Sequence, residues 1–283
     1  MKLLRYGPAG SEKPGLLDAD GGVRDLSGVV GDIAGAVLTP EGLQKLSVID
    51  PKTLPKVDGN PRLGACVGGA GKFIGIGLNF ADHAAETNMP LPTEPIFFMK
   101  ATSCLCGPND EVIKPKDSTK LDWEVELGFV IGKKASYVSE AEALDHIAGY
   151  CLVNDVSERE FQLGRPGGQW DKGKGCDTFG PVGPWLVTAD EIGDTNNLSM
   201  WLEVNGKRYQ DGNSATMVFK PAFLVAYLSR FFTLHPGDIV TTGTPPGVGA
   251  GQKPHPIFLK LGDEMHLGIS GLGEQRQKVV AAP

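Results

Sequence analysis

The sequence predicts a β-rich α+β fold, and three observations support this prediction. The 283 residues include 39 glycines and 21 prolines, which favours many turns between short strands. The segment 120–132, KLDWEVELGFVIG, alternates apolar and acidic residues and then becomes wholly apolar, as expected of a strand that runs from a polar site into a core. Within 201–210, Asn205-Gly206 separates two strand-like runs, which is typical of a hairpin with a type I′ turn.

Composition and charge bear on the class of partner. The hydrophobic share is 41%, the net charge is -7 and the isoelectric point is near 5.3. Nucleic acids and anionic membranes bind basic faces, so neither is expected as the main partner. No apolar run reaches the roughly 18 residues of a membrane helix, and the first residues show no signal-peptide pattern, so we expect a cytoplasmic protein. The cysteines are odd in number, with no CxxC pair, which indicates reduced thiols.

Two units are expected along the chain. Residues 1–70 contain short strand candidates and one helix that begins after Thr39, with Pro40 at its first position, so we interpret them as a small N-terminal domain. Residues 71–283 carry the motifs described below and form the larger domain. Further helices are predicted at 80–88 with Asn79 as N-cap, at 139–147 with a Ser139–Glu142 capping box, and at 220–232.

The acidic residues of the 120–132 strand are the first candidate site. Glu124 and Glu126 are two residues apart, so on a strand they lie on one face about 7 Å apart, although such a pattern is more often a solvated face. Asp155 favours a shared site over a solvated face, because it comes just after the apolar run 148–153 and can meet the two glutamates. Three close carboxylates repel one another unless a cation neutralises them, and oxygen ligands suit Mg²⁺, Mn²⁺ or Ca²⁺ rather than zinc.

A second candidate lies on the predicted helix 80–88. His83 and Glu86 are three residues apart there, so they share a face, and the carboxylate can orient the imidazole as a general base. A solvated surface pair is the commoner origin of this spacing. The pair therefore needs support from other parts of the chain.

Three more segments contain residue types that could contact a substrate. Arg159 and Gln162 have the same i,i+3 spacing close behind Asp155. The loop 164–175 holds five glycines and two lysines, a composition that suits either an anion-binding loop or an exposed one. The loop 242–249, TGTPPGVG, exposes backbone N–H groups that can hold a carboxylate, and a simple tight turn explains it equally well.

Taken in chain order, five segments resemble the motifs of the fumarylacetoacetate hydrolase superfamily. They are IGIGLNFADHAAE, WEVELGFVIG, NDVSEREFQ, KGCDTFGPVGPW and TGTPPGVG, and the resemblance as a whole extends over about residues 73 to 280. Phe80 is a departure, because the family usually has tyrosine there. Within the superfamily, the phrases MKLLRYGP, WDKGKGCDTFGP and YQDGNS resemble bacterial hydrolases of 2,4-diketo-3-deoxy-L-rhamnonate and the related L-fuconate compound.

The resemblance implies a mixed β-roll with a small N-terminal domain, and a homodimer or larger homo-oligomer. It also implies a role for each candidate: Glu124, Glu126 and Asp155 would ligate Mg²⁺ or Mn²⁺, His83 and Glu86 would form a base dyad, Lys174 would stabilise negative charge, and Arg159, Gln162 and Thr244 would contact substrate. The implied reaction is hydrolysis of a C–C bond in an acylpyruvate-type 2,4-diketo acid, giving pyruvate and a second acid such as lactate.

Other functions use the same motifs. Within the family, the alternatives are ureidoglycolate cleavage, oxaloacetate decarboxylation, dehydration of 2-keto-3-deoxy acids and isomerisation of diene-dioates. A non-catalytic, metal-stabilised binding protein is an alternative of another class, and the joint presence of His83, Glu86 and Lys174 argues against it.

Overall fold

The computed structural model describes residues 1–86 and 90–283, and strands dominate its regular structure, as the sequence predicts. The central sheet contains nine strands in the order β3-β2-β1-β13-β10-β9-β16-β4-β5. Their bounds are Lys2–Tyr6 (β1), Lys13–Leu17 (β2), Val23–Asp25 (β3), Phe73–Gly77 (β4), Ile96–Lys100 (β5), Val125–Ile131 (β9), Ile147–Asn154 (β10), Leu186–Thr188 (β13) and Ile239–Thr241 (β16). Strand β16 runs parallel to β4 and antiparallel to β9, so the sheet is mixed.

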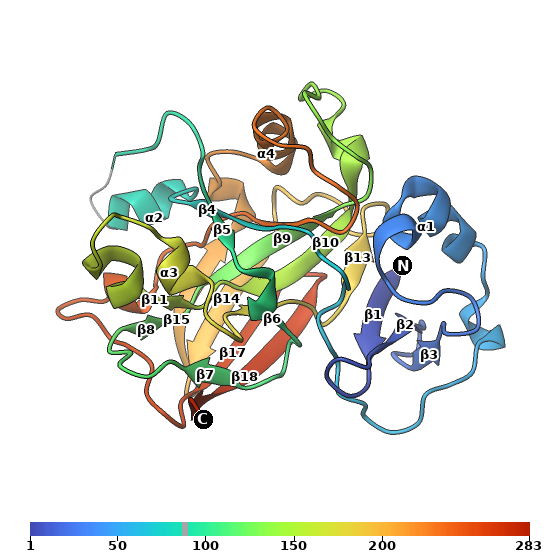
Figure 1. The fold of residues 1–283 in the computed structure, drawn as a ribbon, viewed down its shortest axis with the longest axis horizontal. Coiled ribbons are helices and arrows are strands. Elements are labelled where there is room, and N and C mark those ends of the chain that lie inside the picture. The colour runs from blue at the N-terminus through green and yellow to red at the C-terminus, as the bar shows by residue number, and fades with distance from the viewer. Residues whose placement is uncertain (87–89) are drawn as a thin grey trace.

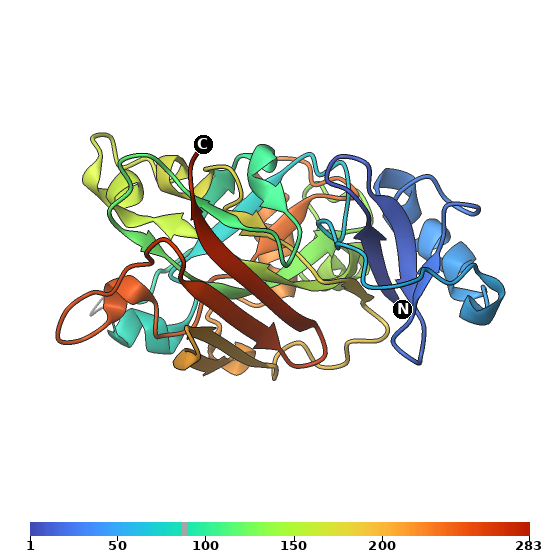
Figure 2. The same cartoon turned by 90° about the horizontal axis from the view of Figure 1, so that it is seen from below.

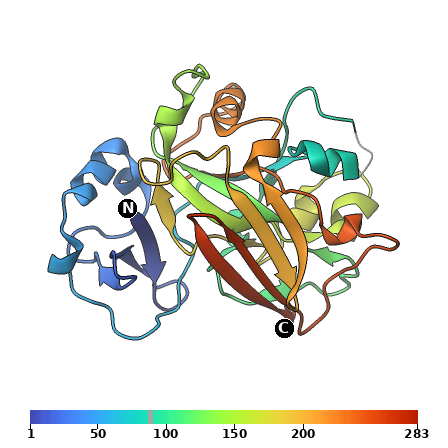
Figure 3. The same ribbon diagram turned by 180° about the vertical axis from the view of Figure 1, so that it is seen from behind.

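A second sheet has five strands in the order β15-β14-β17-β18-β7. Its strands are Val112–Lys114 (β7), Ser199–Val204 (β14), Lys207–Asn213 (β15), Glu264–Ile269 (β17) and Gly273–Ala281 (β18). Strands β14 and β17 contact β9, and β18 contacts β10, so this sheet packs across the middle of the central one (Figures 2 and 3). Two short pairs complete the strands: Leu121–Asp122 (β8) with Ser157–Glu158 (β11), and Leu105–Cys106 (β6) with Gly180–Pro181 (β12).

The core is centred on β9 and β10, in which every residue is buried. Strands that are covered on both faces read as nearly continuous apolar runs, which is the pattern of VELGFVI and IAGYCLVN. The helices are short: Pro40–Ser47 (α1), Ala81–Glu86 (α2), Asp171–Lys174 (α3) and Pro221–Leu228 (α4). Among the described residues, none of the helices is long and apolar enough to cross a membrane.

The N-terminal strands β1–β3 and helix α1 lie together at one end of the molecule (Figure 1). Thr39 caps α1 as predicted, because its hydroxyl accepts a hydrogen bond from the Gly42 N–H at 3.2 Å. Strand β1 pairs with β13, opposing Leu3 to Leu186, so the N-terminal sheet continues the central one. The division of the chain at residue 70 stays a prediction.

Three local predictions are confirmed, two of them for part of the predicted range. Strands β14 and β15 form the expected hairpin, and Asn205 and Gly206 both have the positive φ, 52° and 76°, that a type I′ turn requires. The helix predicted at 220–232 is present as α4, which ends earlier. The helix predicted at 80–88 is present as α2, and the end of that prediction lies outside the described residues.

Four local predictions are wrong in detail. The strand expected over 120–132 divides into β8 and β9, because the Glu124 N–H donates to the side chain of Asn154 in β10 instead of to a backbone carbonyl. Residues 139–147 form turns and a short 3-10 segment, since successive bonds there join residues three apart. The i,i+3 spacing of Arg159 and Gln162 predicts a helical turn over 157–162, but the first two residues pair as β11 and the helical turn starts at Glu160.

The fourth correction concerns Asn79, which was expected to cap α2. Its side-chain amide instead donates to the carbonyls of Phe219 and Thr242, at 3.0 and 2.8 Å, and its oxygen accepts from the Phe219 N–H. Asn79 therefore joins the end of β4 to the segment before α4 and to the end of β16. These contacts fix the point at which the chain turns into α2.

Candidate functional site

The three predicted acidic residues meet at the centre of the molecule. Glu126 lies in β9, Glu124 just before it, and Asp155 just after β10, which pairs with β9 through Val153 opposite Glu126. One carboxylate oxygen from each of these three residues lies within 4.8 Å of the others, and all three side chains are buried. We call Glu124, Glu126 and Asp155 the carboxylate cluster.

Three cations neutralise most of this charge. Lys174 donates to Glu124 and Asp155 at 2.6 and 2.7 Å. Lys100 donates to the other oxygen of Asp155 at 2.5 Å. Arg159 donates to Glu124 at 2.6 Å. Although burial disfavours ionisation, Arg159 and Lys174 lower the pKa of Glu124, and Asp155 and Glu124 raise the pKa of Lys174 against the effect of its burial.

Glu126 differs from the other two acids, because no lysine or arginine among the described residues binds it. One of its oxygens accepts hydrogen bonds from the Thr241 hydroxyl and from the Gly243 N–H. Burial, followed by repulsion from Asp155 and Glu124, raises its pKa well above the usual value. A buried carboxylate in this position requires a proton or a further cation. The oxygen ligands fit a hard divalent cation, so the residues present match the predicted metal site.

The predicted base dyad is assembled as well. His83 Nδ1 lies 3.0 Å from a carboxylate oxygen of Glu86 on α2. Glu86 also accepts a hydrogen bond from the Gly247 N–H at 3.1 Å, so the dyad is anchored to the glycine-rich loop 242–249. Burial raises the pKa of Glu86, but the contacts with His83 and Gly247 outweigh it and lower the value. Glu86 is therefore ionised at neutral pH and can hold an N–H at His83 Nδ1.

The three predicted substrate contacts have different surroundings. Arg159 also binds Asp122 at 2.8 Å and donates to Gln162 at 3.0 Å, so the expected i,i+3 contact exists. The Thr244 hydroxyl donates to the Val125 carbonyl and accepts from Gln210. Because this hydroxyl is already engaged on both sides, a substrate contact from Thr244 is expected through its backbone N–H.

A cavity of about 290 Å³ joins these groups. Its polar lining consists of His83, Glu124, Glu126, Arg159, Gln162, Lys174 and Thr244, and its apolar lining includes Ile76, Leu78, Phe98, Leu163, Trp170 and Val248. All of the predicted site residues except Glu86 and Asp155 line it directly. Those two residues contact His83 and Lys174 from outside the lining.

Sequence reasoning missed two buried residues of the site. Lys100 ends the apolar strand β5, and besides Asp155 it donates to the Lys174 carbonyl, so it fixes both an acid and the segment that carries the lysine. Asp122 accepts hydrogen bonds from the Gly249 and Ala250 N–H groups and from Arg159. The alternation of the 120–132 segment places Asp122 in phase with Glu124, which was a usable signal. No comparable local pattern marks Lys100.

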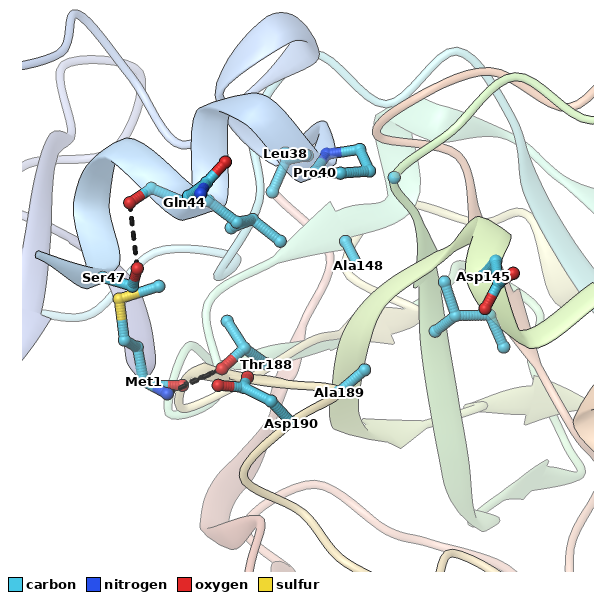
Figure 4. Close-up of a pocket in the computed structure, with 13 residues that line it drawn as sticks. Met1, Leu38, Pro40, Gln44, Ser47, Asp145, Ala148, Thr188, Ala189 and Asp190 are labelled. Carbon is cyan, nitrogen blue, oxygen red and sulfur yellow. Dashed lines mark hydrogen bonds between the residues drawn. The ribbon is translucent and has the colours of Figure 1, made fainter.

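Another cavity, of about 320 Å³, lies between α1 and the strands β10 and β13 (Figure 4). Its labelled side chains include Leu38 and Pro40 on one side and Ala148 and Thr188 on the other. None of the carboxylate cluster lines it. Its residues therefore have no part in the site described above.

Comparison with known proteins identifies the family. The model of the fumarylacetoacetate (FAA) hydrolase C-terminal region matches residues 72–280, which is most of the chain. The chain belongs to the fumarylacetoacetate hydrolase family. This confirms the family resemblance of the five motifs, and the strand-rich fold with a small N-terminal sheet agrees with it. A relative from Burkholderia cenocepacia, named "Putative hydrolase", is 66% identical over 278 residues, 98% of both chains.

Two solved structures carry the same fold over their whole length. One is described as a probable 2-hydroxyhepta-2,4-diene-1,7-dioate isomerase from Mycobacterium abscessus, with 32% identity and a TM-score of 0.84. The other is the maleylpyruvate hydrolase of a Sphingobium species in complex with manganese(II) and pyruvate, with 28% identity and a TM-score of 0.83. Each comparison covers 100% of both chains.

Proposed function

We propose that this protein is a metal-dependent hydrolase that cleaves a C–C bond in a 2,4-diketo acid of the acylpyruvate type. The observation that supports this most directly is the carboxylate cluster with the unpaired Glu126, in a cavity that also contains the His83–Glu86 dyad. A divalent cation held by the three carboxylates would polarise the keto oxygen of a bound 2-oxo acid. The manganese and pyruvate in the Sphingobium hydrolase are consistent with this ligand set.

The charge of the site favours an anionic substrate. Asp122 and the carboxylate cluster contribute four negative charges, and Lys100, Arg159 and Lys174 contribute three positive ones. A divalent cation, Mg²⁺ or Mn²⁺ by preference, changes the sum from -1 to +1. A 2-oxo carboxylate entering the cavity would then meet a net attraction that is strong because these charged side chains are buried.

The dyad provides the base for hydrolysis. With Nδ1 held by Glu86, the other imidazole nitrogen of His83 takes a proton from water, and the water oxygen adds to the C4 carbonyl carbon of the substrate. The C3–C4 bond then breaks and its electron pair passes to C3, which receives the proton back from the imidazolium. The products are pyruvate and the carboxylic acid of the C4 acyl group, so atoms and charge balance.

The remaining residues orient the substrate and oppose its developing charge. Lys174 donates to both Glu124 and Asp155, and in this proposal its ammonium group opposes the negative charge that accumulates on the pyruvyl half. Arg159, Gln162 and the Thr244 N–H are then the groups that position the carboxylate. Within this class the motif phrases favour 2,4-diketo-3-deoxy-L-rhamnonate or the L-fuconate compound, which release lactate, and we expect a homodimer or larger homo-oligomer.

The test is a substrate panel assayed with Mg²⁺, with the products identified by mass spectrometry. The panel contains acylpyruvates, diketo-deoxy sugar acids, oxaloacetate, ureidoglycolate and the heptadienedioate of the isomerase. We expect pyruvate only from the diketo acids. Isomerisation of the dienedioate without hydrolysis of any diketo acid would instead favour the alternative that the Mycobacterium abscessus structure suggests.

The dyad can be tested by non-additivity. His83→Ala should lower kcat by roughly 10²- to 10⁴-fold, since a positioned general base typically contributes that much. Because Glu86 acts through His83, the double substitution His83→Ala/Glu86→Gln should lose little more than His83→Ala alone. Fully multiplicative losses would show that Glu86 has a separate role.

A further inference from the structure

The apolar part of the cavity lining is built into the sheet. Strand β4 has the sequence FIGIG, and its two glycines, Gly75 and Gly77, lie on the same face of the strand. A Cβ atom at Gly75 would lie 2.2 Å from the Phe98 ring, and one at Gly77 would lie 2.4 Å from the Trp170 indole. Both glycines are therefore required for the two rings to rest on β4.

The two rings form a rigid wall. Phe98 stands directly opposite Gly75 in the β4–β5 pair and is buried. Its ring centroid lies 5.7 Å from that of Trp170, a contact distance at which aromatic pairs are attractive. Leu163 continues the lining toward the solvent and is 62% exposed. We call Phe98, Leu163 and Trp170 the apolar wall.

The cations of the lining are already engaged: the Lys174 ammonium group, 5.1 Å from the centroid of the Phe98 ring, is bound to Glu124 and Asp155. Arg159 and Lys174 are the only lysine or arginine residues that line the cavity in the described chain, and both are bound to the acids of the site. Residues 87–89 are Thr, Asn and Met, so they add none. Lys172 lies nearby in the chain but donates to the Pro166 carbonyl, and it does not line the cavity.

We infer that this enzyme selects 2,4-diketo acids whose C4 acyl group is uncharged, and that the apolar wall excludes substrates with a second carboxylate. The inference rests on the proposed function, which places the 2-oxo carboxylate at the carboxylate cluster and directs the acyl group along the rest of the lining. A carboxylate held against the buried Phe98 and the half-buried Trp170 gives up part of its hydration without gaining an unengaged cation, which is unfavourable. A lactoyl group, with one methyl and one hydroxyl, carries no such penalty.

This selectivity differs from that suggested by the names of the structural relatives. Maleylpyruvate and the heptadienedioate each carry a second carboxylate, and those names describe the proteins from Sphingobium and Mycobacterium abscessus. The present chain shares their fold, so the difference has to lie in side chains of the lining. The apolar wall is the part of the lining where such a difference would act.

The first experiment compares two substrates of equal length, 2,4-dioxoheptanoate and 2,4-dioxoheptanedioate, with the Mg²⁺-loaded enzyme. We expect kcat/KM to be on the order of 100-fold or more higher for the monoacid, because an unpaired charge in an apolar pocket is rejected more strongly than a missing methylene. Equal values for the two substrates would overturn the inference.

Two variants at Leu163 then test the cause of the selectivity. Leu163→Arg adds a cation at the exposed end of the wall, where its guanidinium stays hydrated, and should raise kcat/KM for the dioate by roughly 10-fold or more. Leu163→Gln is the uncharged control of similar size and should leave the ratio of the two substrates nearly unchanged. The inference is wrong if both variants change the ratio alike, or if neither changes it.

A binding measurement separates failure of the inference from failure of the proposed function. The monoketo acids 2-oxoheptanoate and 2-oxoheptanedioate lack the C4 carbonyl and cannot be hydrolysed, so their effect on Tm reports binding alone. We expect the monoacid to raise Tm more than the dioate. If neither diketo acid is cleaved, the hydrolase proposal fails, and this pair alone decides the selectivity: an equal or larger rise with the dioate overturns it.

Discussion

Two charge clusters in this molecule have the same net charge and opposite surroundings. The carboxylate cluster with Asp122 and its three cations sums to -1. The second cluster, which we call the N-terminal ion-pair cluster, consists of Arg5, Glu12, Asp32, Arg62 and Asp110 and also sums to -1. In the first cluster the side chains are 10% exposed or less, whereas in the second Asp32, Arg62 and Asp110 are 35%, 31% and 22% exposed around the more enclosed Arg5 and Glu12, at 15% and 9%.

The difference lies in where the unbalanced charge resides. In the N-terminal ion-pair cluster every carboxylate has an arginine partner, and Arg62 holds Asp110 with two nitrogens at 2.7 and 2.5 Å. Water can hydrate the surplus charge there. In the buried site the surplus falls on Glu126, which is 1% exposed. The same net charge of -1 therefore accompanies a partly hydrated ion-pair network in the N-terminal cluster and a candidate cation-binding site in the buried one.

Removing one cation from each cluster should give the largest difference in kcat between the two clusters. Lys174→Met removes the ammonium group that joins Glu124 to Asp155, and we expect kcat to fall by on the order of 10²-fold or more. The matched variant Arg62→Met should leave kcat unchanged and cost about 1 kcal/mol of stability, as exposed pairs do. Steady-state kinetics and thermal melts measure both effects. An unchanged kcat for Lys174→Met would make its contacts purely structural.

A second comparison neutralises one acid in each cluster. Without added metal, Glu126→Gln should raise Tm, because folding forces the Glu126 carboxyl group either to take up a proton or to remain an unpaired charge, whereas glutamine avoids both costs and keeps an acceptor for Thr241 and Gly243. The wild-type protein should gain about 2.7 kcal/mol when Mg²⁺ or Mn²⁺ is present at 100 times its Kd, and Glu126→Gln should lose this gain. Asp110→Asn is the matched control.

The control is expected to behave in the opposite way. Asp110→Asn removes one partner of Arg62, so it should lower Tm slightly without metal and keep the full response to metal. If Glu126→Gln lowers Tm in the absence of metal and still responds to the ion, the unpaired carboxylate is not the basis of the site.

The sequence could predict the parts of the site that depend on local spacing. Glu124 directly precedes the strand that carries Glu126, and His83 and Glu86 share one helical turn, so short-range spacing brings each pair together. The position of Asp155 follows from the buried strand that precedes it. These local rules, with the turn chemistry at Asn205-Gly206, also account for the β-rich character of the fold.

The rest of the site depends on sheet order, which no local pattern reveals. Glu86 bonds to Gly247, 161 residues away, because β16 lies beside β4 and delivers its following loop to α2. Lys100 reaches Asp155 only because β5 is the next strand outward from β4. The break before Glu124 likewise depends on Asp122 meeting the Gly249 N–H, 127 residues along the chain.

The smallest expected effect concerns Glu12 in the N-terminal ion-pair cluster. Burial opposes its ionisation, but the contacts with Arg62 and Arg5 prevail, so its pKa lies below the usual 4.5. A carboxyl group with a lowered folded-state pKa stabilises the native state above its unfolded pKa, and this contribution is lost as the pH falls through the folded value. Glu12→Gln should therefore cost about 1 kcal/mol or less at pH 7, and the gap to wild type should close below pH ~4.5.

Thermal melts of both proteins between pH 7 and pH 3 measure this gap. The other acids titrate in both proteins, so their contribution cancels in the difference. Because Glu12 does not line the cavity of the candidate site, the variant should keep the wild-type kcat and metal response. A gap that stays constant down to pH 3 would mean that Glu12 acts through packing and not through its charge, and the pairing of the N-terminal ion-pair cluster would then contribute nothing measurable to stability.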